Sequence, residues 1–127
     1  MTRLLLDTHV VLWWDDASSS LGREARRAIE DAAAVYVSAA SEWELSIKAA
    51  LGKVRVRRTI KDATTAAGFE LLTVSFEHAQ AVRQLAPLHK DPFDRLLVAT
   101  ASVEGLTVVS ADPSLARYPI QWIDAGE

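Results

Sequence analysis

The sequence predicts one α/β domain over residues 1–127, an α/β/α sandwich around a mostly parallel central sheet of about five strands. Three observations predict it. The length of 127 residues suits a single domain. The strand-like segments are continuous apolar runs, which are typical of parallel strands covered on both faces. Helical patterns fill the gaps between these runs, and strands that alternate with helices indicate a parallel sheet.

The expected strands recur at intervals too long for a β-meander. They cover residues 3–6, 35–38, 71–74 and 106–110, with a weaker fifth at 120–123. The expected helices cover residues 22–33, 41–51, 60–67, 77–85 and 91–104. Three of these helices end directly before a glycine, Gly52, Gly68 or Gly105, as helices often do. The last one has a strong start signal, because Asp91 precedes Pro92 and an acid follows at Asp94.

Composition excludes several function classes. A hydrophobic fraction of 50% and a charged fraction of 24% exclude intrinsic disorder. With no Cys, the chain holds neither a disulfide scaffold nor a thiolate zinc site nor a cysteine nucleophile. We expect a cytoplasmic protein without a signal peptide or membrane span, because Asp7 and His9 interrupt the apolar N-terminal stretch. The net charge of −3 means that any nucleic acid must meet a local basic patch or a bound metal.

Four acidic residues stand at element ends where a parallel sheet places its ligands. Asp7 ends the first strand and Asp112 follows the fourth. Glu44 lies early in the helix after the second strand, and Asp94 lies in the first turn of the helix before the fourth. Two of them also have a plain structural interpretation: Asp112 precedes Pro113 in a turn, and Glu44 can form a helical pair with Lys48. Asp7 is harder to explain in this way, because a carboxylate that ends a buried strand needs a partner. Their joint placement at one edge of the sheet is the informative feature.

Four carboxylates in one pocket repel one another, and a divalent cation removes that cost. Oxygen ligands without Cys or paired His favour Mg²⁺ or Mn²⁺ over zinc. Such ions polarise a phosphoryl oxygen and activate water. Two of them can hold both the attacking oxygen and the leaving oxygen of a phosphoryl displacement. The pattern therefore predicts phosphodiester hydrolysis.

The chain also resembles the PIN domain family, and within it the VapC-type toxin ribonucleases of toxin–antitoxin systems. The resemblance covers nearly the whole chain in order, in the stretches LLLDTHVVLWW at 4–14, SAASEWELSIKAALGK at 38–53, HKDPFDRLLVATA at 89–101 and LTVVSAD at 106–112. It implies a Mg²⁺-dependent endoribonuclease with a PIN-like fold, in which Mn²⁺ can substitute for Mg²⁺.

The resemblance implies which residues form the site. The catalytic and metal-binding quartet is Asp7, Glu44 rather than Glu42, Asp94 rather than Asp91, and Asp112. Small polar residues near the metal, with one lysine that reaches a phosphate, are expected to contact the substrate: Thr8, Ser41, Ser110 and Lys48. Asp91 is interpreted as a helix cap. The three histidines are set aside as ligands, although His9 is expected to line the pocket.

The expected partners are an RNA substrate, a cognate antitoxin and a second copy of the chain. Trp13, Trp14 and the helix at 41–51 are the candidate antitoxin contacts, and the homodimer is implied by the family. A basic run without acids, Lys48 to Lys61, holds 6 of the 14 basic residues and is either an RNA-contacting surface or a solvated face.

The two alternative function classes are a binding module and a phosphoryl-accepting domain. A non-catalytic PIN-like module that binds RNA or protein is the alternative to the enzyme. A haloacid-type phosphatase needs a second aspartate where this chain has His9, and a receiver needs an acceptor aspartate where the third strand gives way to Val74, Ser75 and Phe76.

Overall fold

The computed structural model describes residues 2–127. Within these residues five strands form one sheet with the order β3-β2-β1-β4-β5, and every neighbouring pair is parallel. The strands are β1 (Arg3–Leu6), β2 (Ala34–Ser38), β3 (Glu70–Leu72), β4 (Thr107–Ser110) and β5 (Trp122–Asp124). The predicted fold class is confirmed, with the third and fifth strands displaced by one or two residues.

Six α-helices connect the strands across the described part of the chain. They are α1 (Thr8–Asp15), α2 (Arg23–Asp31), α3 (Ala39–Ala50), α4 (Ile60–Ala67), α5 (Phe76–Ala81) and α6 (Pro92–Glu104). Two 3₁₀ turns, η1 (Val82–Gln84) and η2 (Pro113–Arg117), complete the connections. Helix α1 was not predicted, and α5 and η1 stand where one continuous helix was expected.

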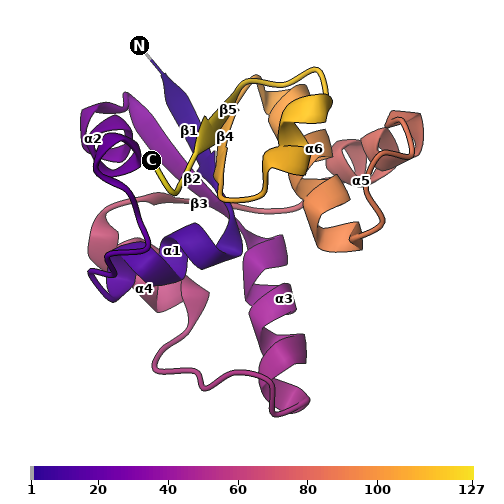
Figure 1. Cartoon of the computed structure of the whole chain (residues 1–127). Coiled ribbons are helices and arrows are strands. Elements are labelled where there is room, and N and C mark those ends of the chain that lie inside the picture. Colours follow the sequence, from indigo (N-terminus) through magenta and orange to yellow (C-terminus); the bar gives the residue numbers. More distant parts are fainter. Residues whose placement is uncertain (1) are drawn as a thin grey trace.

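Helices cover both faces of the sheet, as continuous apolar strands require. Successive residues of β1 point to opposite faces. Leu4 and Leu6 pack in a core with side chains of α1, α2 and α4, while Leu5 packs with Leu97 and Val98 of α6. All three leucines are fully buried. Figure 1 shows α6 on one side of the sheet and α1 with α4 on the other.

The strand order reverses at β1, and this reversal positions the site. The chain adds β2 and β3 on one side of β1, then returns to add β4 and β5 on the other. The segments that leave the carboxyl ends of β1 and β4 therefore diverge, and parallel sheets bind ligands in the crevice between such segments. Leu6 pairs with Val109 in the register of the two strands, so their ends are level.

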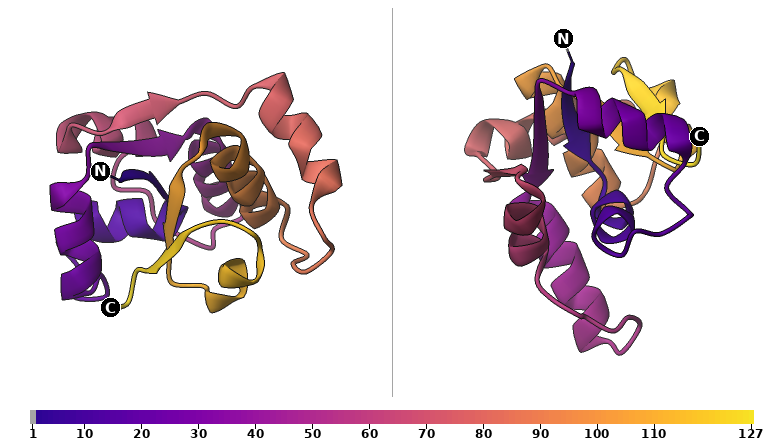
Figure 2. Two further views of the ribbon diagram at one scale, coloured as in Figure 1. Left: turned by 90° about the horizontal axis from the view of Figure 1, so that it is seen from above. Right: turned by 90° about the vertical axis from the view of Figure 1, so that its left-hand side faces the viewer.

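Helix α3 leaves the carboxyl end of β2 and extends beyond the body of the sheet, as the two further views show (Figure 2). Its N-cap is Ser38, whose side chain accepts a hydrogen bond from the amide of Ala40. Across residues 2–127, no helix is both long and apolar enough to cross a membrane.

Candidate active site

The strand reversal brings Asp7 and Asp112 to the same crevice. Asp7 follows β1 directly and its amide donates to Val109 O at 3.0 Å, which joins the ends of β1 and β4. Ser110, the last residue of β4, donates from Oγ to Asp7 Oδ2 at 2.7 Å and accepts from the amide of Asp112 at 3.1 Å. One buried hydroxyl therefore links the two acidic segments.

Glu44 enters the crevice from α3. Its carboxylate is held from two sides, because Thr8 Oγ1 donates to Oε1 at 2.7 Å and Lys48 Nζ donates to Oε2 at 2.8 Å. Ser41 Oγ lies 2.9 Å from the Thr8 hydroxyl and extends this network. The helical pair of Glu44 with Lys48 is thus present, and it lies inside the crevice.

Asp94 enters from the first turn of α6. The side chain of Asp91 caps this helix, because Oδ1 accepts from the amides of Phe93 at 2.8 Å and Asp94 at 3.2 Å. Pro92 occupies the first helical turn, where its missing N–H costs nothing. The interpretation of Asp91 as a cap is confirmed. This cap fixes the start of α6 and with it the position of Asp94 in the first turn.

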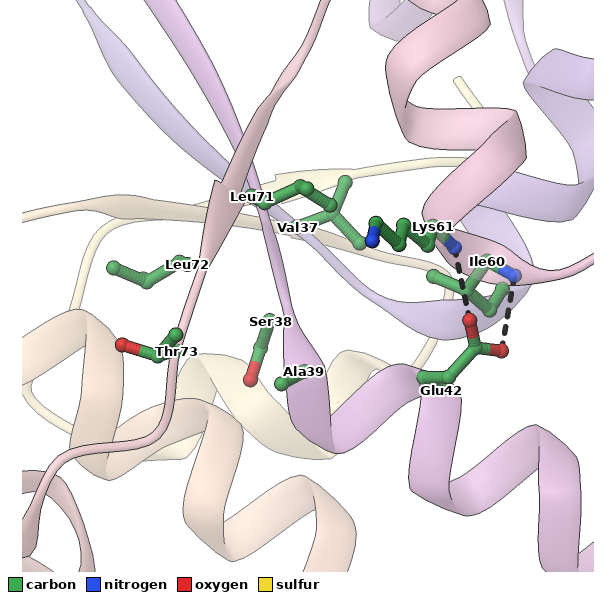
Figure 3. A pocket seen from close by; sticks show the side chains of 9 residues that line it. All are labelled: Val37, Ser38, Ala39, Glu42, Ile60, Lys61, Leu71, Leu72 and Thr73. Carbon is green, nitrogen blue, oxygen red and sulfur yellow. Dashed lines mark hydrogen bonds between the residues drawn. The ribbon is translucent and has the colours of Figure 1, made fainter.

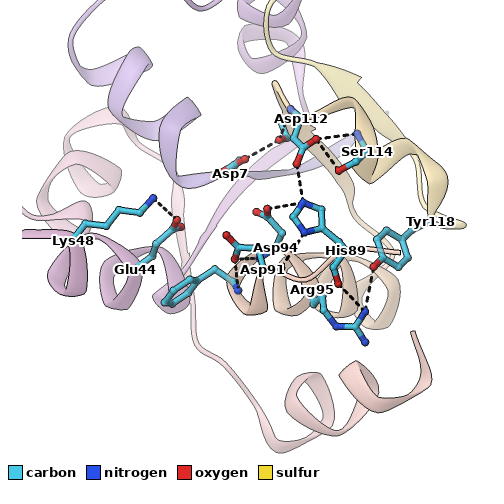
Figure 4. Close-up of polar contacts among 12 residues, drawn as sticks. Asp7, Glu44, Lys48, His89, Asp91, Asp94, Arg95, Asp112, Ser114 and Tyr118 are labelled. Atoms are coloured by element: carbon cyan, nitrogen blue, oxygen red, sulfur yellow. Dashed lines mark hydrogen bonds and ion pairs between the residues drawn. The ribbon is translucent and has the colours of Figure 1, made fainter. Parts of the chain in front are cut away.

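The four acids line one cleft of about 390 Å³. The residues that line it are Asp7, His9, Trp13, Glu44, Lys48, Asp91, Asp94, Ala111 and Asp112. The close-up shows Asp7, Glu44, Asp94 and Asp112 arriving from four different segments (Figure 4). The structure therefore brings the whole predicted quartet together, and His9 lines the cleft as expected.

Electrostatic strain marks the cleft. Burial, together with the charges of Asp7 and Asp91, raises the pKa of Asp94 to about 7. Burial also raises the pKa of Asp7, although the hydrogen bond from Ser110 opposes the rise. Burial acts in the same direction on Asp112, but hydrogen bonds from His89 and Ser114 outweigh it and lower that pKa. Burial therefore disfavours the ionised forms of Asp7 and Asp94 in this cleft.

A hard divalent cation fits this donor set. Carboxylate oxygens are the ligands that Mg²⁺ and Mn²⁺ prefer, and the raised pKa values of Asp7 and Asp94 mark a charge that a cation would balance. Holding several carboxylates at one crevice destabilises the folded state, so the arrangement points to a ligand rather than to stability.

His89 also belongs to the site, which the sequence did not predict. Its Nε2 lies 2.9 Å from Asp112 Oδ2 and 3.2 Å from Asp94 Oδ2. Ligand-type atoms of these three residues all lie within 4.8 Å of one another. The available signal was its place two residues before the Asp91 cap, on the turn that leads into α6.

Three of the residues expected to contact the substrate have hydroxyls that support the acids. Thr8, Ser41 and Ser110 are 6%, 4% and 0% exposed. Their hydroxyls are used within the networks of Glu44 and Asp7, so they orient these carboxylates. The expectation that these three contact the substrate stays a prediction. The amino group of Lys48 remains at the cleft surface, where its bond to Glu44 raises its pKa.

Glu42 has a different role from Glu44, which agrees with the choice made from the sequence. Its two carboxylate oxygens each accept a hydrogen bond at 3.0 Å, from the amides of Ile60 and Lys61. It therefore caps the start of α4. It borders a separate apolar hollow of about 230 Å³ beside Leu71 and Leu72 of β3 (Figure 3).

Part of the basic run is already paired. Arg57 and Arg58 both donate to the carboxylate of Asp15 at the end of α1, and Arg57 also reaches Asp16 at 3.0 Å. The hydrogen bond from Arg58 lowers the pKa of Asp15. These two arginines therefore join the loop before α4 to α1.

The expected antitoxin contacts differ in their surroundings. Trp14 packs on Phe69, with a ring-centroid distance of 5.4 Å, whereas Trp13 lines the acidic cleft. Both tryptophans lie at the edge of the core. Trp43 of α3 is 57% exposed, and Leu51, the C-cap of this helix, is 64% exposed. Apolar surface thus adjoins the cleft.

Comparisons with known proteins agree with this geometry. A family model for the PIN domain matches residues 4–121. Ribonuclease VapC22 of Mycobacterium tuberculosis is 31% identical over 121 residues, which is 93% of both chains. Among solved structures, VapBC2 from Rickettsia felis bound to a promoter DNA fragment has a TM-score of 0.69 at 13% identity, covering 97% of this chain and 98% of that one. FitAcB from Neisseria gonorrhoeae has a TM-score of 0.65 at 20% identity, covering 96% and 97%.

The family match includes every segment that brings an acid to the cleft. The two structural likenesses concern the fold, because their identities are low. The assignment of this chain to a family rests on the family match and on the 31% identical relative. The chain belongs to the PIN domain family, as a VapC-type member.

Proposed function

We propose that this chain is a metal-dependent endoribonuclease that acts as the toxin of a toxin–antitoxin pair. The observation that carries the proposal is the convergence of Asp7, Glu44, Asp94 and Asp112 on one cleft, with a raised pKa at two of them. Because carboxylates gathered in one cleft destabilise the folded state, their convergence supports binding of a cation that balances their charge. The curated relative, which is called a ribonuclease, supports RNA as the substrate.

The four carboxylates are the residues that would hold Mg²⁺, with Mn²⁺ as a substitute. When bound, the ion would polarise a phosphoryl oxygen and lower the pKa of water. The chain's own groups orient the ligands: Thr8 holds Glu44, and Ser110 holds Asp7. Lys48 is the cation at the cleft surface that is placed to contact a phosphate of the RNA backbone. A cytoplasmic location is part of the proposal.

Metal removal tests the activity. The purified protein should cleave RNA in Mg²⁺ or Mn²⁺, lose cleavage in excess EDTA, and recover it when either ion is restored. The measurement is gel-resolved cleavage of a mixed RNA pool at constant ionic strength, because salt alone weakens RNA binding. Cleavage that persists in EDTA would contradict the metal. RNA binding without cleavage in either ion would favour the non-catalytic binding module.

An antitoxin is the proposed partner, and solved complexes of similar fold include toxin–antitoxin assemblies. We propose that a segment of the antitoxin, disordered when free, folds over α3 and places a basic side chain at the cleft. Trp13, Trp14 and the exposed apolar residues of α3 are its proposed contacts. Folding on binding lets one segment cover a large surface.

Co-expression with the neighbouring gene should yield a complex and suppress toxicity. Replacing exposed Trp43 with Ser should weaken the complex by about tenfold or more, because aromatic side chains dominate such interfaces. Leu71→Ser, on the exposed edge strand β3, is the matched control and should leave affinity unchanged. If no complex co-purifies, the antitoxin proposal fails. Light scattering on the isolated chain tests the proposed homodimer.

A further inference from the structure

His89 is held in one tautomer by its own loop. The amide of Asp91 donates to Nδ1 at 3.0 Å, so Nδ1 must carry the lone pair and Nε2 the proton. The ring therefore donates its Nε2 proton to Asp112 Oδ2 at 2.9 Å, and the same nitrogen lies 3.2 Å from Asp94 Oδ2. The side chain of His89 is 19% exposed.

This arrangement excludes His89 as a ligand while both bonds persist. A histidine binds a metal through a nitrogen lone pair, and here one lone pair accepts from Asp91 while the other nitrogen bears a proton. The two carboxylates lose no capacity, because each oxygen has a second lone pair. The ring thus bridges two acids from separate segments without competing for the cation.

The loop that carries His89 is fixed from its other side by Arg95. Its guanidinium donates to Ala86 O at 3.0 Å, to Val82 O at 3.3 Å and to His89 O at 3.4 Å. Arg95 also reaches the Tyr118 hydroxyl at 3.3 Å (Figure 4). His89 is held at both its carbonyl oxygen and its Nδ1, so its ring has little freedom to rotate. A fixed ring is suited to hold the carboxylates of Asp94 and Asp112 in place.

We propose that His89 is a positioning residue, which holds Asp94 and Asp112 in the relative orientation that a divalent cation requires. The inference deepens the proposed function and depends on it. Outer hydrogen bonds of this kind set the orientation of metal-binding carboxylates, and their loss costs about 10–100-fold in metal affinity. Without the bridging N–H, repulsion separates the two carboxylates.

The test compares Mn²⁺ affinity, measured by calorimetry, in the parent and two variants. His89→Met removes the donor at similar size and should weaken Mn²⁺ binding by about tenfold or more. His89→Gln keeps an amide N–H and should restore affinity to within about threefold of the parent. In cleavage assays the Met variant should need more Mn²⁺ for half-maximal rate and approach the parent rate at saturation.

His78 provides a matched control. Its Nδ1 accepts from the amide of Ser75 at 3.1 Å and its Nε2 contacts Glu104 Oε2 at 3.1 Å, which repeats the arrangement away from the cleft. His78→Met should lower thermal stability without changing Mn²⁺ affinity. Equal Mn²⁺ affinity in the parent and His89→Met would overturn the inference, as would failure of His89→Gln to restore binding.

A metal-free measurement separates this inference from the proposed function. Long-range ¹H–¹⁵N NMR of the imidazole should show His89 with its proton on Nε2 and a lone pair on Nδ1. A proton on Nδ1 would overturn the inference even if Mn²⁺ binds. If the parent binds no Mn²⁺, the metal-dependent function fails, and the inference about His89 fails with it.

Discussion

Asp94→Asn should abolish RNA cleavage and at the same time stabilise the metal-free protein at neutral pH. Asn keeps the shape of the side chain but removes a ligand charge, so activity should fall by about 100-fold or more. Stability should rise because burial and the charges of Asp7 and Asp91 raise the pKa of Asp94 to about 7. The folded protein therefore resists ionising this group.

The sign of the pH dependence follows from the two pKa values of Asp94. Between an ordinary value near 3.8 and the folded value of about 7, the native state binds more protons than the unfolded state. Stability therefore falls as pH rises through this window. Each pKa unit corresponds to about 1.4 kcal/mol, so Asn should recover on the order of 2–4 kcal/mol at pH 8 and little at pH 4.

Urea unfolding in EDTA at pH 5 and pH 8 measures the difference in stability between Asp94→Asn and the parent. Cleavage assays in Mg²⁺ measure the loss of activity. Asp91→Ser is the control, since Ser also caps helices and should cost at most about 1 kcal/mol while activity persists. If Asp91→Ser abolished cleavage and Asp94→Asn preserved it, the two acids would have been assigned the wrong roles. A parallel pH dependence in Asp94→Asn and the parent would contradict the strained carboxylate.

Asp7→Asn should also lower activity by about 100-fold or more without unfolding the protein. Its backbone contacts do not involve the carboxylate: the amide donates to Val109 O at 3.0 Å, and the carbonyl accepts from Val10 at the start of α1. An amide oxygen can still accept from Ser110 Oγ. Because burial raises the pKa of Asp7, stability at pH 7 should be unchanged or higher.

Asp15→Asn is the matched substitution at the other end of α1. The hydrogen bond from Arg58, helped by Arg57, lowers the pKa of Asp15, so its ionised form stabilises the fold and its loss should lower stability. Activity should remain. Asp7→Asn should thus lose cleavage without losing stability, whereas Asp15→Asn should lose stability without losing cleavage; gel assays and thermal unfolding measure the two properties. Equal activity in Asp7→Asn and the parent would refute the role of Asp7.

The sequence predicted the elements whose signals are local. Alternation of apolar runs with helical patterns gave all five strands and their parallel arrangement, and Asp91-Pro92 marked the start of α6. Helix α1 was missed for a physical reason. It follows β1 directly, its β-branched Val10 and Val11 extend the apolar run, and its N-cap makes no side-chain hydrogen bond. Packing against α4 and the sheet decides its conformation.

The candidate site likewise contains residues that local signals predict and residues that depend on packing. The quartet was predictable because strand ends and helix starts meet at one edge of a parallel sheet. His89 was not, because it lies in an irregular segment whose course depends on the bonds from Arg95. The pairing of Arg57 with Asp15 spans 42 positions and no periodic pattern encodes it. Burial of Thr8, Ser41 and Ser110 likewise emerges only when the helices pack.

The central position of β1 also sets when the cleft can exist during synthesis. Ser110 and Asp7, whose hydrogen bond joins the two halves of the site, are 103 positions apart. Chains emerge from the ribosome amino end first, so β1 can pair with β2 long before β4 is available. Closure over such a separation is slow. A growing chain therefore has no complete cleft until β4 has been made, and a cut anywhere between Asp7 and β4 would leave fragments that each lack part of the acidic set.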